Sequence, residues 1–364
     1  MNDLVSLVVE RAIQIQQVPA PTFSEQKRAE LVRELFLAEG MHDVCTDETG
    51  NIFARFPGAG IAKPLIVSAH LDTVFPMETN LRVARGSDLI HGPGLGDNSL
   101  GVAALFGLLW SLRERQIPLR GDVWLVANVC EEGLGDLRGM KAVVERFGDK
   151  VHAYLVLEGL ALGHVYHRAV GVRRYRITAR TAGGHSWSDY GQPSAVHELA
   201  KLVVELASLS LPTYPRTTMN VGKISGGTSV NVIASDASLD LDLRSEGQES
   251  LTALVSAVDR VIQKANNKSG VDVEWQVIGQ RPAGEIAANH PLVSLAKDCL
   301  HEQGMDAGLI SGSTDANVPL SKGYPALVLG ITTGGSAHTV HEYINITPIA
   351  QGMEQLVRFV SRVW

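Results

Sequence analysis

Three apolar segments of this chain, each about the length of a strand, lead directly into polar side chains that can bind metal. The segments are residues 65–69, 123–129 and 154–157, and the polar residues that follow them are His70 and Asp72, Glu131 and Glu132, and Glu158. In open α/β sheets, ligands bind at the carboxyl ends of the strands. The sequence therefore predicts an α/β fold with a ligand-binding site at one edge of its sheet.

The middle of the chain follows a different pattern. From about residue 169 to residue 276, apolar and polar residues alternate, as in residues 239–244, and alternation indicates strands with one face in water. Helices are expected near residues 195–207 and 251–265. We therefore predict an inserted α+β domain of antiparallel sheet plus two helices. The expected domains are residues 169–276 for the insertion, and residues 1–168 together with 277–364 for a discontinuous first domain.

Length, composition and charge limit the class of protein. A chain of 364 residues suggests about two domains, and 45% hydrophobic with 20% charged residues is ordinary globular composition. The net charge of -7 argues against a nucleic-acid binder, which needs a basic face. The first residues lack the basic segment of a signal peptide, and no uninterrupted apolar run reaches the roughly 18 residues of a membrane span. We expect a cytoplasmic protein with no nucleic-acid or membrane partner.

The cysteine pattern agrees with a reducing compartment. Cys45, Cys130 and Cys299 are odd in number and widely spaced, so they form neither a disulfide framework nor a cysteine-based zinc site. We expect all three to be free thiols.

A glycine-rich segment, residues 92–98, contains Asp97. Its glycines do not have the G-x-G-x-x-G spacing of a dinucleotide-binding loop, and no apolar strand leads directly into it. Flexible backbone would instead let the Asp97 carboxylate reach between two metal ions. We interpret Asp97 as a metal-bridging ligand.

Two further features concern carboxylates at strand ends. Asp72 lies two residues after His70, where it can hold the second ring nitrogen of a ligating imidazole. Glu131 and Glu132 are adjacent, and two carboxylates are costly to bury unless something compensates their charge. One of them can bind metal while its neighbour faces the water that the metal binds. A solvated loop is the alternative for this pair.

The last candidate ligand is a histidine near the C-terminus, where both His338 and His341 are suitable. With His338 in this place, the set supplies two imidazoles and three carboxylates. The negative charges of three carboxylates and one hydroxide balance two divalent ions, as a buried site requires. One ion is expected to be bound by His70, Asp97 and Glu158, and the other by Asp97, Glu132 and His338. Each ion keeps an open position, as catalytic zinc does.

Nine short motifs follow one another in an order and spacing that resemble metallopeptidase family M20. This family includes relatives of carboxypeptidase G, peptidase T, aminoacylase, acetylornithine deacetylase and succinyl-diaminopimelate desuccinylase. The motifs are SAHLDT (68–73), GPGLGD (92–97), EEGLGDLRG (131–139), LEG (157–159), GGHS (183–186), SVNVI (229–233), LDLR (241–244), STDA (313–316) and AHTVHEY (337–343). The resemblance covers nearly the whole chain. It implies a zinc-exopeptidase-like catalytic domain, with a mixed sheet flanked by helices, and an inserted lid and dimerisation domain.

The resemblance also implies roles in the first domain. Glu131 matches the general base, and Glu132 matches the metal ligand beside it. In the last motif the ligand histidine stands four residues before the Glu-Tyr pair, which selects His338 over His341.

In the inserted domain, His185 and Asn231 match positions that contact the substrate or its oxyanion. Arg244 matches an arginine that binds a substrate carboxylate. Asp315 matches a further motif position, to which no role is assigned. The Asp97–Asn98 peptide is expected to be cis.

These features together predict a co-catalytic two-metal hydrolase. It would cleave an amide or peptide bond of a small substrate bearing a free carboxylate, as carboxypeptidases and dipeptidases do, by attack of a metal-bridging water with Glu131 as general base. Two divalent ions per chain are expected, zinc first, and a carboxylate-rich site also accepts manganese or cobalt. The expected partners are a small peptide or N-acyl amino acid as substrate and a second copy of the chain, which would form a homodimer through the inserted domain.

Three alternatives remain open at this point. An N-acyl amino acid deacylase would use the same chemistry, and Glu158, where related aminopeptidases carry Asp, favours a carboxypeptidase or deacylase. A non-catalytic metal- or peptide-binding dimer should lack a member of the ligand set. A serine or cysteine hydrolase is disfavoured, because the segment around Ser186 lacks the closing glycine of a nucleophile elbow and Cys130 adjoins two acids that raise its pKa.

Overall fold

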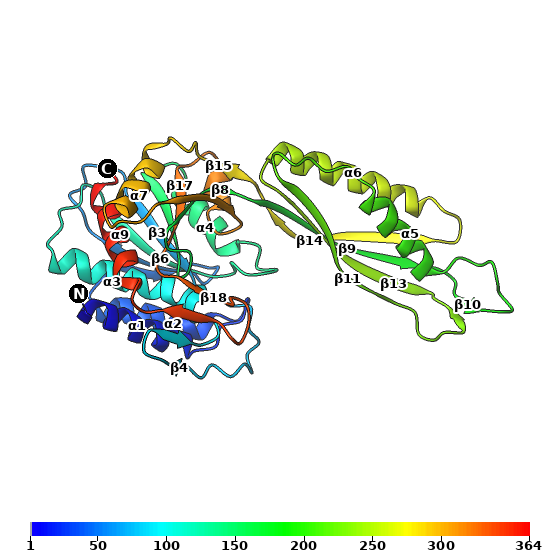
Figure 1. The fold of residues 1–364 in the computed structure, drawn as a ribbon, viewed down its shortest axis with the longest axis horizontal. Coiled ribbons are helices and arrows are strands. Elements are labelled where there is room, and N and C mark those ends of the chain that lie inside the picture. The colour runs from blue at the N-terminus through cyan, green and yellow to red at the C-terminus, as the bar shows by residue number, and fades with distance from the viewer. Residues whose placement is uncertain (1) are drawn as a thin grey trace. The chain divides into compact units, whose positions relative to one another are not determined.

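The computed structural model describes residues 2–364, which form two compact units (Figure 1). Unit 1 consists of Met1–Ala169 and Glu285–Trp364, and unit 2 of Val170–Gly284. The sequence pattern had placed the end of the insertion at residue 276. Strand β14 (Asp272–Arg281) continues past this point and stays paired with β9 (Gly171–Arg180). A register shift between Val277 and Gly279 interrupts the alternation there, which explains why the pattern ended early.

Unit 1 is built on a mixed sheet with parallel strands at its centre. In spatial order the strands are β1 (His42–Thr46), β2 (Ile52–Phe56), β6 (Val123–Asn128), β3 (Leu65–His70), β7 (Ala153–Glu158), β17 (Ala326–Gly330), β8 (His164–Ala169) and β15 (Gly284–Glu285), with β16 (Gly308–Gly312) paired to β8. β6, β3, β7 and β17 are mutually parallel, whereas β1 is antiparallel to β2, β2 to β6, and β8 to β17. The side chains of β3 are all buried, as its continuous apolar sequence predicts.

Helices cover this sheet. They are α1 (Asn2–Gln16), α2 (Gln26–Ala38), α3 (Leu100–Glu114), α4 (Arg138–Phe147), α7 (Pro291–His301), α8 (Asn317–Ser321) and α9 (Ile349–Arg362). The most apolar of them, α3, packs on β3 and β7 and is contacted by α1 and α9 (Figure 1). Among the described residues, Leu95–Glu114 alone is long and apolar enough to cross a membrane, but 89% of its apolar 18-residue window is buried within the structure, as in a core helix.

A small antiparallel sheet in unit 1 joins distant parts of the chain. Its strands are β18 (Gly334–Gly335), β19 (Tyr343–Asn345), β5 (Leu89–His91) and β4 (Ala84–Arg85). The pairing of β19 with β5 brings the C-terminal AHTVHEY motif next to the start of the glycine-rich segment.

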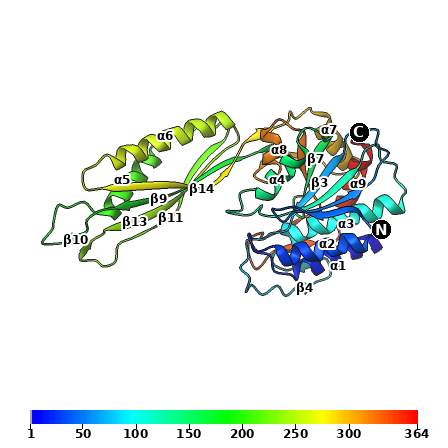
Figure 2. The ribbon, with the colours of Figure 1, turned by 180° about the vertical axis from the view of Figure 1, so that it is seen from behind.

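Unit 2 has the predicted antiparallel sheet and two helices. Its strand order is β11 (Thr217–Gly226), β13 (Asp236–Ser245), β9 and β14, and its helices are α5 (Ala195–Ala207) and α6 (Gln248–Asn266). Both helices lie along one face of the sheet (Figures 1 and 2). The leucines of residues 239–243 point into this covered face, and the alternating acidic residues point to the other, where Arg176 binds Asp240. The mixed α/β fold with an α+β insertion is thus confirmed.

Candidate metal centre

The candidate ligands of unit 1 come from the carboxyl ends of neighbouring parallel strands. His70 is the last residue of β3, and its register partner on β6 is Asn128, three residues before Glu131. Glu158 is the last residue of β7, on the other side of β3. The register therefore delivers these side chains to one edge of the sheet, where the apolar strands had predicted a site.

Asp97 and His338 reach the same place from outside the large sheet. Asp97 lies in η1 (Leu95–Ser99), a short turn that leads into α3; the backbone angles of Asp97 are not helical, and its peptide bond to Asn98 is cis. His338 lies in the loop between β18 and β19. Three groups of possible ligand atoms result, each with all atoms within 4.8 Å of one another: His70, Asp97 and Glu158; Asp97, Glu132 and His338; and His70, Glu131 and Glu132.

The two carboxylate oxygens of Asp97 face two different histidines. Oδ1 lies 3.2 Å from Nε2 of His70, and Oδ2 lies 3.0 Å from Nε2 of His338. Each imidazole nitrogen also faces a second carboxylate: Glu158 Oε2 is 3.7 Å from His70, and Glu132 Oε1 is 3.1 Å from His338. Asp97 is therefore placed between two ligand groups, each with one imidazole and one further carboxylate.

These distances fit the binding of metal ions. Two ligands of one tetrahedral zinc ion, bound at about 2.0–2.2 Å, lie roughly 3.4 Å apart. Imidazole nitrogen and carboxylate oxygen are ligands for zinc and for related divalent ions. Both the atom types and their spacing are suitable for two divalent ions sharing Asp97, while metal binding itself stays a prediction.

The electrostatics of the two imidazoles show how strongly this place favours positive charge. Burial lowers the pKa of His70, but hydrogen bonds to Asp72, Asp97 and Glu158 outweigh it and hold this pKa well above its usual value. Hydrogen bonds to Asp97 and Glu132 raise the pKa of His338 to about 10. Carboxylates that attract a proton so strongly also attract a divalent cation, for which the imidazole must give up that proton.

Asp72 ties two of these ligand segments together. Its Oδ1 accepts a hydrogen bond from the backbone N–H of Glu131 at 2.9 Å, and its Oδ2 accepts from the N–H of Glu132 at 2.8 Å and from the hydroxyl of Thr22 at 2.9 Å. Oδ1 also lies 3.6 Å from Nδ1 of His70. Nδ1 of His70 lies 3.0 Å from the backbone carbonyl oxygen of Asp72, so the main chain of Asp72 is placed to hold this ring nitrogen, while its carboxylate fixes the backbone of the two glutamates.

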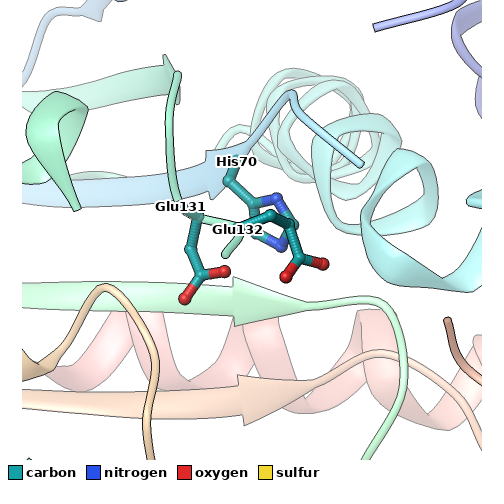
Figure 3. Close-up of side chains that lie close together, drawn as sticks. All are labelled: His70, Glu131 and Glu132. Atoms are coloured by element: carbon teal, nitrogen blue, oxygen red, sulfur yellow. The ribbon is translucent and has the colours of Figure 1, made fainter. Parts of the chain in front are cut away.

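Glu131 and Glu132 are both buried rather than solvated. Figure 3 shows their carboxylates side by side near the imidazole of His70. Glu132 faces His338, as described above, whereas Glu131 belongs only to the group that contains His70 and Glu132. Glu132 therefore lies with Asp97 and His338, as a candidate ligand of the same metal ion, and Glu131 lies beside these ligands.

The sequence assigned no contact to two further residues, Glu342 and Asn98. Glu342 is fully buried and accepts backbone hydrogen bonds from the segment that contains Asp97. The Asn98 side chain donates to Leu157 O and accepts from Gly159 N, both at 2.8 Å, so it holds the two neighbours of Glu158. Glu342 lies in the AHTVHEY motif, but nothing in the motif indicates what its carboxylate contacts.

Asp315 is fully buried close to the candidate ligands. Its Oδ2 accepts a hydrogen bond from Asn128 Nδ2 at 2.7 Å, and its Oδ1 has no hydrogen-bond partner among the described residues. Burial raises the pKa of Asp315 to about 7. Asp315 therefore supports the end of β6 rather than joining any of the ligand groups.

The remaining predicted residues lie in unit 2. β10 (Gly184–His185) pairs with β12 (Val232–Ile233), and Ser186 N donates to Asn231 O at 3.1 Å, so the structure brings His185 and Asn231 together. Both are exposed. Arg244 is also exposed, on β13, where its Nε donates to Asp242 Oδ2 at 2.7 Å.

A hollow of about 830 Å³ lies beside the β10–β12 pair. It is lined by residues of unit 2 alone, among them Tyr190, His197 and Val230. None of the candidate metal ligands belongs to it, so the hollow and the metal centre are separate features.

The cysteines are free, as expected, in the described chain. Burial, together with the charges of Glu25 and Asp72, raises the pKa of the Cys130 thiol to about 12. A thiol with so high a pKa supplies little thiolate at neutral pH, which argues against Cys130 as a nucleophile.

Comparison with known proteins supports the family and the fold that the sequence predicts. The family model described as "Peptidase family M20/M25/M40" matches residues 66–362. A tripeptidase from Staphylococcus aureus superposes with a TM-score of 0.86 at 23% identity, covering 99% of this chain and 98% of that one. The YXEP protein of Bacillus subtilis, described as a dinuclear metal binding peptidase, superposes with a TM-score of 0.72 at 14% identity, covering 99% and 98%. Carboxypeptidase G2 from a Pseudomonas species is 24% identical over 85% of this chain and 76% of its own length.

Proposed function

The chain belongs to peptidase family M20/M25/M40, and from this premise we propose that it hydrolyses an amide or peptide bond of a small substrate bearing a free carboxylate. The proposed site is the metal centre of unit 1, with two divalent ions, zinc first. An N-acyl amino acid is the alternative substrate to a peptide, because the bond that breaks is the same.

The observation that carries this proposal is the position of Asp97. Its two oxygens lie within 3.2 Å of imidazole nitrogens from two different groups, and each group has one further carboxylate. A single carboxylate shared by two such groups is the arrangement of a two-metal site. His70 and Glu158 would complete the first position, and Glu132 and His338 the second.

The metal ions would lower the pKa of a water molecule toward neutrality and polarise the substrate carbonyl. Glu131 lies beside the ligands and would accept the proton of the attacking water, as a carboxylate base positioned for this step can. The water oxygen bonds to the carbonyl carbon, the carbon–nitrogen bond breaks, and Glu131 returns the proton to the leaving amine. Asp72 would keep Glu131 and Glu132 in place through their backbone N–H groups.

His185, Asn231 and Arg244 are proposed as substrate contacts on the basis of the family resemblance. His185 and Asn231 lie together on the β10–β12 pair, and an imidazole with a neighbouring amide can donate hydrogen bonds to a developing oxyanion. Within residues 2–364, the guanidinium of Arg244 has its Nε bound to Asp242, and its terminal nitrogens are suited to a carboxylate. This set would give a preference for substrates with a free carboxylate.

Metal reconstitution with a substrate panel tests the proposal. The purified protein is stripped with a chelator and titrated with zinc, manganese or cobalt, while cleavage of dipeptides and N-acetyl amino acids is assayed. We expect activity to rise with metal and to level off near two equivalents per chain. The best substrate then distinguishes a peptidase from a deacylase.

Two other results would contradict the proposal. Saturation at one equivalent would exclude the shared role of Asp97. Stoichiometric binding of two ions without turnover of any substrate in the panel would favour a non-catalytic metal- or peptide-binding protein.

We also propose that the chain forms a homodimer through unit 2. β11 is an edge strand of the four-stranded sheet, and its second half is exposed. An exposed edge strand is able to pair with another chain. Analytical ultracentrifugation of the full chain, and of a variant with Ile224→Lys on this strand, tests the proposal: the variant should be monomeric.

A further inference from the structure

Glu342 is a buried carboxylate to which the proposed reaction assigns no role. Its Oε1 accepts hydrogen bonds from the backbone N–H of Gly96 at 2.6 Å and of Asp97 at 2.9 Å, and its Oε2 accepts from Gly94 N–H at 3.0 Å. Its backbone carbonyl accepts from Gly92 N–H at 2.9 Å. Every one of these donors belongs to the glycine-rich segment that contains Asp97.

These contacts fix a segment whose sequence would otherwise leave it flexible. Glycines at 92, 94 and 96 give the backbone many accessible conformations, and ordering them costs conformational entropy. Three N–H groups that converge on the two oxygens of one carboxyl group offset part of this cost, because each buried donor gains a hydrogen-bond acceptor. One of the three is the N–H of Asp97 itself, so the anchor acts directly at the bridging residue.

The arrangement parallels that of Asp72. Asp72 accepts the backbone N–H groups of Glu131 and Glu132, and Glu342 does the same for Asp97 and its preceding glycines. Of the ligands in the group of His70, Asp97 and Glu158 and the group of Asp97, Glu132 and His338, Asp97 alone belongs to both. A residue that positions Asp97 therefore acts on both metal positions at once, whereas each other ligand of these two groups acts on one.

We propose that Glu342 is the positioning residue of Asp97 and thereby sets the affinity of both metal positions. This inference rests on the proposed two-metal site. To position Asp97 in this way, Glu342 must use both of its side-chain oxygens as hydrogen-bond acceptors. An amide in the same place has one acceptor oxygen and turns its NH₂ group either toward the N–H of Gly94 or toward those of Gly96 and Asp97, so Glu342→Gln keeps the volume but weakens the anchor.

The test is a calorimetric titration of metal-free protein with zinc. Wild type should bind two ions, and Glu342→Gln should weaken both binding steps, by about 10- to 100-fold, as loss of an outer-shell partner does. His338→Ala is the first comparison, because His338 belongs to one group only and should weaken mainly one step. Asp88→Asn is the second, because Asp88 accepts hydrogen bonds from Thr347 beyond the end of β19 without touching Asp97, and it should leave both steps unchanged.

The outcomes separate this inference from the proposed function. If wild type binds two ions and Glu342→Gln binds both as tightly, or loses only one step, Glu342 does not position Asp97. If wild type binds fewer than two ions, the two-metal function fails and the inference fails with it.

A folding defect is checked by the thermal transition and near-ultraviolet circular dichroism of the metal-free variants. If Glu342→Gln does not fold, Glu342→Asp replaces it in the titration. This variant keeps the charge but withdraws both oxygens by one methylene, and the same loss in both steps is expected. Unchanged binding by the folded Asp variant would overturn the inference.

Discussion

The two units hold their candidate functional side chains in different ways. In unit 1, His70, Glu131 and Glu132 are 2–6% exposed and lie at or just beyond the ends of apolar strands, whereas His338, on a loop, is the exposed member of the ligand set. Buried carboxylates hold the backbone around them. In unit 2, His185, Asn231 and Arg244 are exposed, and they stand on a two-stranded pair and on the open face of the sheet.

From this difference we expect the two units to have different roles in the proposed reaction. Side chains held by packing and buried hydrogen bonds are ordered before any ligand arrives, which is what a metal site and a general base require. Exposed side chains lose rotamer freedom only when they bind, so part of their contact energy offsets that loss. Changes in unit 1 should therefore affect metal binding and turnover, and changes in unit 2 should affect the choice of substrate.

The largest effect is expected for Glu131→Gln. The amide cannot accept the proton of the attacking water, so kcat should fall by about 10²- to 10⁴-fold. Both metals should still bind, because Glu131 belongs to neither of the two ligand groups that contain Asp97. Steady-state kinetics and metal analysis of the same preparation measure the two quantities. Loss of metal from this variant, or retention of metal by Glu132→Gln, would show that base and ligand are assigned the wrong way round.

The sequence was most informative where a side chain that can bind metal follows directly on an apolar strand. His70, Glu158 and the Glu131–Glu132 pair could be located because parallel strands deliver their carboxyl ends to the same edge of a sheet. Which oxygen of Asp97 faces which histidine could not be predicted, because it depends on the turn from Leu95 to Ser99 and on its contacts with Glu342.

Long-range hydrogen bonds have no local signature in one sequence. The sequence assigned no contact to Asn98, yet its side chain bonds to both neighbours of Glu158, which lie about sixty positions away. The end of the insertion was misplaced for a different reason, since the bulge near Val277 breaks the period from which the strand was recognised. Patterns predict elements and their ends, whereas contacts between distant segments require the fold.

Asp72→Asn tests whether backbone anchoring accounts for the order in unit 1. Asp72 accepts three hydrogen bonds, two of them from Glu131 and Glu132, and an asparagine keeps one acceptor oxygen. Activity or metal affinity should fall by about 10- to 100-fold. Thr22→Val removes only the hydroxyl contact and should have a smaller effect. If both variants behave as wild type in kinetics and zinc titration, packing alone orders the site.

Arg244→Ala tests the role given to unit 2. A hydrogen-bonded contact to a charged group contributes about 1.5 kcal/mol, roughly tenfold in KM, at the lower end expected for an exposed side chain. KM should rise for substrates with a free carboxylate and stay unchanged for the corresponding amides. The matched control is Arg176→Ala, which removes another arginine bound to an aspartate, Asp240, on the same face. An equal rise for both substrate classes would remove Arg244 from carboxylate recognition.

The smallest effects concern the stability of each unit at acid pH. In unit 1, hydrogen bonds from Arg362 and Arg358 lower the pKa of Glu302 to about 2. In unit 2, burial tends to raise the pKa of Glu198, but Lys201 and Lys268 outweigh it and lower this pKa below its usual value. A carboxyl group whose pKa is lower in the folded state stabilises the fold above its unfolded pKa, about 4.3. This contribution is lost as the pH falls through the folded pKa.

Glu302→Gln and Glu198→Gln should therefore each lower the melting temperature slightly at pH 7, and both differences from wild type should shrink as the pH falls below about 4.3. For Glu302 the difference should vanish near pH 2. If the two units unfold separately, each variant shifts only the transition of its own unit, as hydrogen exchange resolved along the chain would show. A shift of both transitions by either variant would mean that the units unfold as one body. In that case, the candidate side chains of the two units would differ in their exposure to solvent, but the two units would not differ in stability.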